Sequence, residues 1–189
     1  MIPTPCEKRT LQSRSGLTVE FRKDHFGYVD GEGQWKIKPR FEMAEDFAEG
    51  LAAVQVGGKW GYIDTAGRFA IPPRFNQAGP FSEGLAPVRP YAAVRLVGFI
   101  NKSGRMVIDA DYYDARSFCE GLVAVRADEG WGYIDRTGKL VIKPRFQDAY
   151  NFSKGFASVL IKQEDGYHEA RIDKSGRVVW VSPATAPLV

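Results

Sequence analysis

The sequence predicts an all-β protein made of tandem copies of one antiparallel unit. The first observation is a peptide, Trp60-Gly-Tyr-Ile-Asp64, that returns almost unchanged as Trp131-Gly-Tyr-Ile-Asp135. The second is that the residues around this peptide recur with it at a steady period, as tandem repeats do. The third is that no segment keeps a helical pattern of apolar residues over about 12 positions. Together these observations favour short strands joined by tight turns.

Five versions of the peptide can be aligned. The central glycines at positions 27, 61, 98 and 132 are separated by 34, 37 and 34 residues, and Ala170 follows after 38 more. A period of this size is typical of solenoids, propellers and other repeat arrays. We number the copies one to five in chain order, and their central peptides are Phe26–Asp30, Trp60–Asp64, Val97–Asn101, Trp131–Asp135 and Glu169–Asp173.

The first hairpin of each copy is clearest in copy two. Leu51–Val56 is rich in small and β-branched residues, which suit a strand. Gly57 and Gly58 follow, and paired glycines supply the positive φ that a tight hairpin turn requires. Trp60–Asp64 then returns as the second strand. Its alternate side chains must point to opposite faces of the sheet.

The third strand of copy two begins after a second turn. Asp64 accepts hydrogen bonds from backbone groups further along such a turn, and Gly67 tolerates the left-handed conformation that closes it. Arg68–Ile71 is the expected third strand. Pro72 ends it, because proline has no amide hydrogen to donate to a sheet. A connector then leads to the next copy.

The other copies keep this order of elements. Copies three and five have longer hairpins, with 14 and 15 residues between the opening and central positions where the others have 11. Each copy opens on a glycine, at Gly16, Gly50, Gly84, Gly121 and Gly155. The connectors carry Pro-Arg-Phe or a related step and then a second aromatic residue, which is Phe47, Phe81, Phe118 or Phe152.

This order resembles the WG-repeat family, also called KWG repeats, of mostly bacterial proteins. Copies two and four match the family pattern nearly throughout, and the resemblance covers about residues 15–181. It implies three-stranded antiparallel repeats of about 36 residues, in a propeller-like ring or an open β-solenoid. We therefore expect an amino-terminal arm over residues 1–14, a single repeat domain of about five copies over 15–181, and a carboxy-terminal tail over 182–189.

Composition indicates ordinary globular material with no marked charge. Of the 189 residues 44% are hydrophobic and 26% charged, and the net charge of +3 comes from interleaved basic and acidic residues. This excludes the basic block of a nucleic-acid footprint, and no apolar run approaches a membrane span. Cys6 and Cys119 could pair, but nothing in their spacing indicates it, and we expect free thiols in a reducing compartment. With no visible secretory signal, we expect a cytoplasmic protein.

The residues give no sign of catalysis. His25 and His168 are expected as exposed hairpin-tip residues, and neither has a second histidine or a cysteine at metal-ligand spacing. The recurrent acidic position, exemplified by Asp64, is better explained as a turn cap than as a calcium ligand, because each turn offers one acid. An enzyme would need a pocket at divergent positions such as Glu169, Arg171 and His168. We expect no enzyme, no cofactor and no metal.

Two groups of residues are candidates for binding another protein. Arg40, Arg74 and Arg145 share one slot between proline and phenylalanine, so the repeat places them in equivalent positions. The long hairpin of copy three carries Arg89, Tyr91 and Arg95, which are residue types common in interface hot spots. More generally, function is expected where the repeat pattern fails, in copy three at Val97 and in copy five.

The sequence therefore predicts a non-catalytic module that binds an unidentified protein, but neither nucleic acid nor membrane. Its size suggests an immunity or inhibitor protein that binds a toxin. The alternative is a carbohydrate or small-ligand binder with one aromatic pocket per copy. That alternative requires Trp60, Tyr62, Trp131 and Tyr133 to be partly exposed around equivalent pockets.

Overall fold

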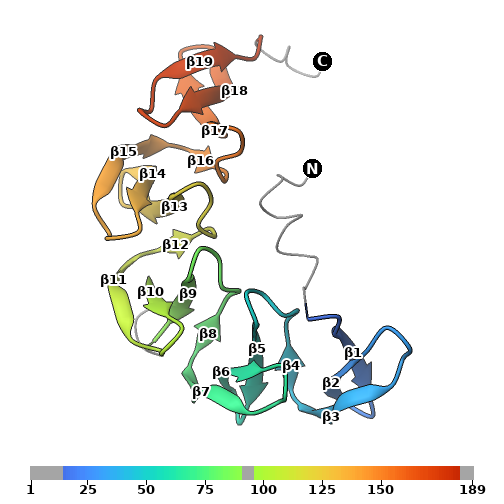
Figure 1. Cartoon of the computed structure of the whole chain (residues 1–189). Coiled ribbons are helices and arrows are strands. Elements are labelled where there is room, and N and C mark those ends of the chain that lie inside the picture. The colour runs from blue at the N-terminus through green and yellow to red at the C-terminus, as the bar shows by residue number, and fades with distance from the viewer. Residues whose placement is uncertain (1–14, 91–95, 184–189) are drawn as a thin grey trace. The chain divides into compact units, whose positions relative to one another are not determined.

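The computed structural model describes residues 15–90 and 96–183 and consists there of strands and turns (Figure 1). Because these residues form no helix, none that could cross a membrane is found among them. The prediction of an all-β fold is confirmed. The strands are β1 Thr18–Arg22, β2 His25–Val29, β3 Trp35–Phe41, β4 Met43–Ala44, β5 Leu51–Val56, β6 Lys59–Asp64, β7 Phe69–Phe75, β8 Gln77–Ala78, β9 Leu85–Arg89, β10 Val97–Asn101, β11 Met106–Tyr112, β12 Asp114–Ala115, β13 Leu122–Ala127, β14 Gly130–Asp135, β15 Leu140–Phe146, β16 Asp148–Ala149, β17 Phe156–Gln163, β18 Gly166–Asp173 and β19 Val178–Val181.

The strands form five antiparallel sheets within the described residues, one for each copy. The first sheet has three strands in the order β1-β2-β3, as the sequence predicts. The expected end of the third strand of copy two is wrong, because β7 continues through Pro72 to Phe75. Each later sheet has a fourth strand of two residues, which comes from the connector of the preceding copy. In Figure 1 the ribbon can be followed from β7 into β8 and from β15 into β16, each time leaving one sheet and joining the next. The connector is thus the link between neighbouring copies.

The hairpins have the turn geometry that their glycines require. Val56 pairs with Lys59 across the first hairpin of copy two, and Gly57 and Gly58 between them have φ of 59° and 70°. The second strand approaches the third so closely that a side chain has no room at the central glycine. A Cβ atom on Gly61 would lie 2.6 Å from the Ile71 carbonyl oxygen. The invariant use of glycine in the first four copies follows from this close approach.

The described chain divides into two compact units, which we describe separately. The unit that ends at Asp111 holds copies one to three and two apolar clusters, one between copies one and two and one between copies two and three. The unit that begins at Tyr112 holds copies four and five and one cluster between them. In both units the core therefore lies between neighbouring sheets. The choice between a ring and an open solenoid, and the single domain over 15–181, stay predictions.

Cys119 departs from the expected free thiol. It is fully buried and disulfide-bonded, so that expectation is wrong at this position. Cys6 lies outside the described residues. Disulfides are typical of oxidising compartments, so the cysteines no longer support the cytoplasmic location, which stays a prediction.

Candidate functional site

The recurrent turn aspartate caps its own turn. In copy two a carboxylate oxygen of Asp64 accepts hydrogen bonds of 2.9 Å from the backbone N–H groups of Ala66 and Arg68. These bonds stabilise the charged form, and the bond from the Arg68 N–H is the main reason why the pKa of Asp64 is lowered. Asn101 accepts the same two bonds in copy three. Among the described residues no three potential metal ligands cluster.

Each sheet has two faces with different tasks, seen most simply between copies two and three. One face of copy two carries Ala53, Tyr62 and Ile71, and it packs in one cluster against Ala86 and Val88 of copy three. We call the face that packs on the following copy the trailing face, and the face that packs on the preceding copy the leading face. Equivalent clusters join copy one to copy two and copy four to copy five.

The central tyrosine anchors the trailing face. Tyr62 is completely buried, lies with its ring 4.9 Å from that of Phe81 and donates a 2.8 Å hydrogen bond to the Gly79 carbonyl in the connector. Tyr133 does the same with Phe152 and Tyr150 in copy four. Burial raises the pKa of both phenols above the usual range. These hydroxyls therefore form hydrogen bonds inside the protein.

The arginines predicted to bind a partner are exposed but already make a contact between copies. One guanidinium nitrogen of each donates to the carbonyl of the turn glycine in the next copy, at 2.5, 2.5 and 2.6 Å, and the group stacks on the neighbouring phenylalanine ring. The pairs are Arg40 with Gly67, Arg74 with Gly104, and Arg145 with Gly176. This gives the slot a structural function that repeat symmetry alone did not reveal, and its use by a partner stays a prediction.

The aromatic residues of the ligand-binding alternative are largely interior. Tyr62 and Tyr133 are fully buried and Trp131 is 5% exposed, while Trp60 is half-buried and packs against the cluster between copies two and three. The partly exposed rings that the alternative requires are therefore not found at Tyr62, Tyr133 and Trp131.

The long hairpin of copy three is described only in part. Arg89 ends β9, is half-buried, and its carbonyl accepts a hydrogen bond from the Asn76 N–H. Tyr91 and Arg95 lie outside the described residues. Val97, which replaces the tryptophan of copies two and four, is buried in β10.

The two histidines differ in their surroundings. His25 is exposed, as expected. His168 is 4% exposed, so the expectation is wrong there. Its Nε2 lies 2.8 Å from an Asp165 carboxylate oxygen and its Nδ1 lies 3.2 Å from the Ser182 carbonyl. The bond to Asp165 is the main reason why the pKa of His168 is raised. The extra length of the copy-five hairpin makes this contact possible.

The trailing face of copy five departs from the repeat pattern, because residues that are buried on this face in copy four are exposed here. The residues at the tyrosine and isoleucine positions are Arg171 and Trp180, which pair with each other across β18 and β19. Both are exposed, Trp180 by 49%, where Tyr133 and Ile142 of copy four are exposed by 0% and 4%. Phe156 takes the place of the opening leucine. An aromatic and cationic surface thus replaces a packing surface.

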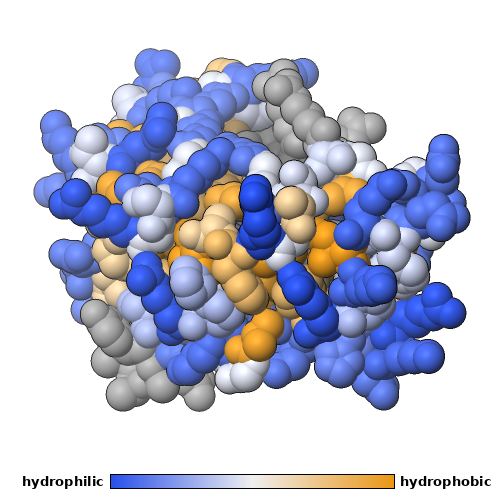
Figure 2. Space-filling model, turned by 60° about the horizontal axis from the view of Figure 1, so that its bottom comes forward, coloured by the Kyte–Doolittle hydropathy of each residue, from blue (hydrophilic) through white to orange (hydrophobic). Residues whose placement is uncertain are grey.

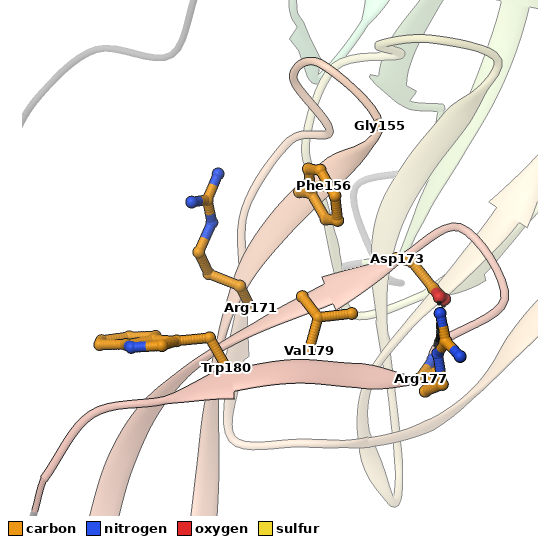
Figure 3. A pocket seen from close by; sticks show the side chains of 7 residues that line it. All are labelled: Gly155, Phe156, Arg171, Asp173, Arg177, Val179 and Trp180. Carbon is orange, nitrogen blue, oxygen red and sulfur yellow. Dashed lines mark hydrogen bonds and ion pairs between the residues drawn. The ribbon is translucent and has the colours of Figure 1, made fainter.

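An open pocket lies on this face (Figure 3). The Arg171 guanidinium lies 5.4 Å from the centroid of the Phe156 ring, as in a cation–π contact. Arg171 and Trp180 extend to the same side of the hairpin in Figure 3, while Arg177 turns toward Asp173 and is ion-paired with it at 3.1 Å. The remaining lining residues are Gly155 and Val179. Among the described residues, no carboxylate lies within ion-pair distance of Arg171.

The sequence marks copy five as divergent, but it does not show that Arg171 and Trp180 pair on one exposed face. From the sequence alone, Arg171 is a candidate only for a catalytic group with Glu169 and His168. In the structure the His168 ring is buried against Asp165. Alignment of the copies marks Trp180 as divergent, because it takes the position of the buried isoleucines of the earlier copies.

Comparison with solved structures gives distant matches. A Bacteroides caccae protein of unknown function matches at 15% identity and a TM-score of 0.40, covering 88% of this chain and 77% of its own. A calcium-binding protein, regucalcin, from Agrobacterium tumefaciens matches at 13% identity and a TM-score of 0.42, covering 88% of this chain and 70% of its own. No curated protein sequence matches the chain.

The repeats themselves match a known family. The profile described as WG containing repeat matches residues 26–60, 60–89, 98–130 and 131–163, which together are more than half of the chain. These matches cover the central peptide and third strand of each of the first four copies. The chain therefore belongs to the WG-repeat family.

Proposed function

We propose that this WG-repeat protein is a non-catalytic module that binds another protein. The observation that carries the proposal is a pair of apolar positions at the start of the third strand, which is the outer strand of its sheet in every copy. Single exposed apolar residues are ordinary on a protein surface, but a recurrent exposed position is a regular surface feature. The exposed residues at these positions are Phe69, Ala70, Val107, Leu140, Val141, Val178 and Val179.

The third strands favour contact through side chains over strand addition. An exposed edge strand can recruit a further strand through its free backbone groups. Here Pro39, Pro73 and Pro144 interrupt the edge in copies one, two and four, and proline has no N–H to donate. Figure 2 shows one face of the molecule, on which hydrophobic side chains are exposed between charged ones, an arrangement common in transient interfaces.

At finer detail, we propose an immunity or inhibitor protein whose partner is a toxin. A rigid surface formed before binding favours tight inhibition, because little ordering accompanies association. The direct test is co-expression with a toxin encoded beside the gene. The proposal expects cell growth to be restored by the wild type and not by a chain with Leu140 and Val141 changed to serine. No protection by the wild type would contradict the toxin partner.

The broader proposal is tested by affinity capture followed by reconstitution from purified components. The immobilised wild-type chain is expected to capture one partner protein. The purified partner should then bind the wild-type chain directly in calorimetry. The Leu140→Ser/Val141→Ser variant should bind at least about tenfold more weakly. Lys143→Ser, on the same strand, is the matched control and should bind normally. Equal binding by all three chains would rule out the third strands as the interface.

A further inference from the structure

Copies one and five carry opposite charges at two repeat positions. In the earlier junctions these two positions belong to neighbouring copies and lie in the same apolar cluster. At three junctions the central tyrosine of one copy lies in the same cluster as a valine of the next copy. These valines are at most 1% exposed. The pairs are Tyr28 with Val54, Tyr62 with Val88, and Tyr133 with Val159. The junction geometry therefore brings the tyrosine and valine positions together.

Both positions are changed where the series ends. Copy five has Arg171 at the tyrosine position, on its trailing face. Copy one has Glu20 at the valine position, on its leading face, because Glu20 pairs with Gly27 as Val54 pairs with Gly61. Glu20 is exposed, as is Arg171. Within the described residues neither side chain forms an ion pair.

The residues of a second ionic contact between copies also change in copies five and one. Glu120 of copy four accepts a hydrogen bond from the Gly155 N–H and pairs with Lys174, both in copy five, at 3.0 and 3.3 Å. Glu49 makes the same contacts with Gly84 and Lys102. In copy five this position is Lys154. In copy one Gly31 stands at the position of the turn lysine, and Glu32 follows it. The acidic position is thus basic in copy five, while the lysine position of copy one is a glycine with an acidic residue beside it.

We propose that the trailing face of copy five binds the leading face of copy one in a second molecule of this chain. Arg171 then pairs with Glu20, and Lys154 lies near Glu32. A polar terminal face would by itself keep a repeat protein soluble. The trailing face instead exposes Phe156 and Trp180, which need an apolar neighbour, and copy one offers Trp35, half-buried at the edge of its leading face.

Association of this kind is head to tail. The two contacting surfaces differ, so the interaction can continue from one molecule to the next and either closes into a ring of molecules or extends as a filament. It leaves the exposed third strands of copies two, three and four free, and it is independent of the protein-binding function proposed above. Failure of one proposal therefore leaves the other standing.

The test is charge reversal followed by mixing, with full-length protein in sedimentation velocity from low to high micromolar concentration. Wild type is expected to associate as concentration rises. Glu20→Arg and Arg171→Glu place like charges at the junction, and each should weaken association at least about tenfold. Mixing the two variants restores one opposite pair at every junction and should restore association. Lys143→Glu, an exposed reversal on β15, is the control and should behave as wild type.

Two outcomes would overturn the proposal. One is wild-type protein that stays monomeric over the whole concentration range. The other is association that persists in both single reversals, because then the charged pair does not form the contact. Circular dichroism and thermal unfolding of each variant confirm that it is folded. The mixing result uses the same two chains that fail alone, so recovery cannot come from a change in their folding.

Discussion

Copies four and five have the same fold and lie in the same compact unit, yet the trailing face is buried in copy four and exposed in copy five. The trailing face of copy four packs against copy five, which buries Tyr133 and Ile142. The face of copy five exposes Arg171 and Trp180 at the corresponding places. The difference shows that a residue which defines the repeat is needed inside the series. In copy five the same positions are exposed and available for another interaction.

The largest expected difference between the two faces is in stability. Tyr133→Ala removes a buried ring and its hydrogen bond to the Tyr150 carbonyl, and should lower the free energy of unfolding by about 3–5 kcal/mol. Arg171→Ala removes an exposed side chain and should cost less than about 1 kcal/mol. Urea unfolding followed by circular dichroism measures both. Similar losses at the two positions would mean that the trailing face of copy five is also a packing surface.

The central glycine gives a second contrast between the copies. A Cβ atom on Gly132 would lie 2.5 Å from the Ile142 carbonyl oxygen and 2.7 Å from the Pro144 nitrogen, so Gly132→Ala must displace backbone. We expect a loss of about 1–3 kcal/mol in the free energy of unfolding. Copy five already has a buried alanine, Ala170, and Ala170→Gly should change stability by no more than about 1 kcal/mol. The denaturant midpoints of the two variants measure both changes. Equal changes in stability for Gly132→Ala and Ala170→Gly would contradict the prediction.

Much of the fold could be predicted because turns and close approaches leave a mark in the sequence. Gly57, Gly58 and Gly67 occur where positive φ is required, and Asp64 occurs where a turn needs a hydrogen-bond acceptor. The two-residue outer strands, such as β8, could not be predicted in this way. They depend on the arrival of a connector beside the next sheet, and two residues are too few for a side-chain pattern.

The candidate surfaces were less predictable, for a related reason. Arg145 has an ordinary exposed composition in the sequence, and only the structure shows its bond to the Gly176 carbonyl in the next copy. Trp180 would be expected in a core, because large aromatic side chains usually are. Alignment shows that Trp180 replaces an isoleucine, but its exposure depends on what packs against the trailing face, which the local sequence does not show.

The inter-copy arginine should have a smaller effect than either core position. Arg145→Ala removes the hydrogen bond to Gly176 and the stacking on Phe146, and should lower the free energy of unfolding by about 1 kcal/mol. Lys143→Ala, two residues away and also exposed, should change it by less than about 0.5 kcal/mol. Copy five offers no equivalent arginine, since Pro183 occupies the position. Equal effects of the two variants would mean that the Arg145 contact contributes nothing to holding the copies together.

The smallest expected effect is a pH dependence that belongs to copy five alone. His168 is buried beside Asp165, and the contact raises the pKa of the imidazole and lowers that of the carboxyl. The folded state therefore holds the histidine proton more tightly than the unfolded state does. The resulting stability is fully present below the ordinary histidine pKa of about 6.5 and is lost as the pH rises through the higher folded value. His168→Gln should remove this rise in stability toward acid pH, measured as the denaturant midpoint over a pH series. His25→Gln, at the exposed hairpin tip of copy one, should keep the rise in stability toward acid pH. If His25→Gln removed that rise and His168→Gln did not, the pH dependence would belong to His25.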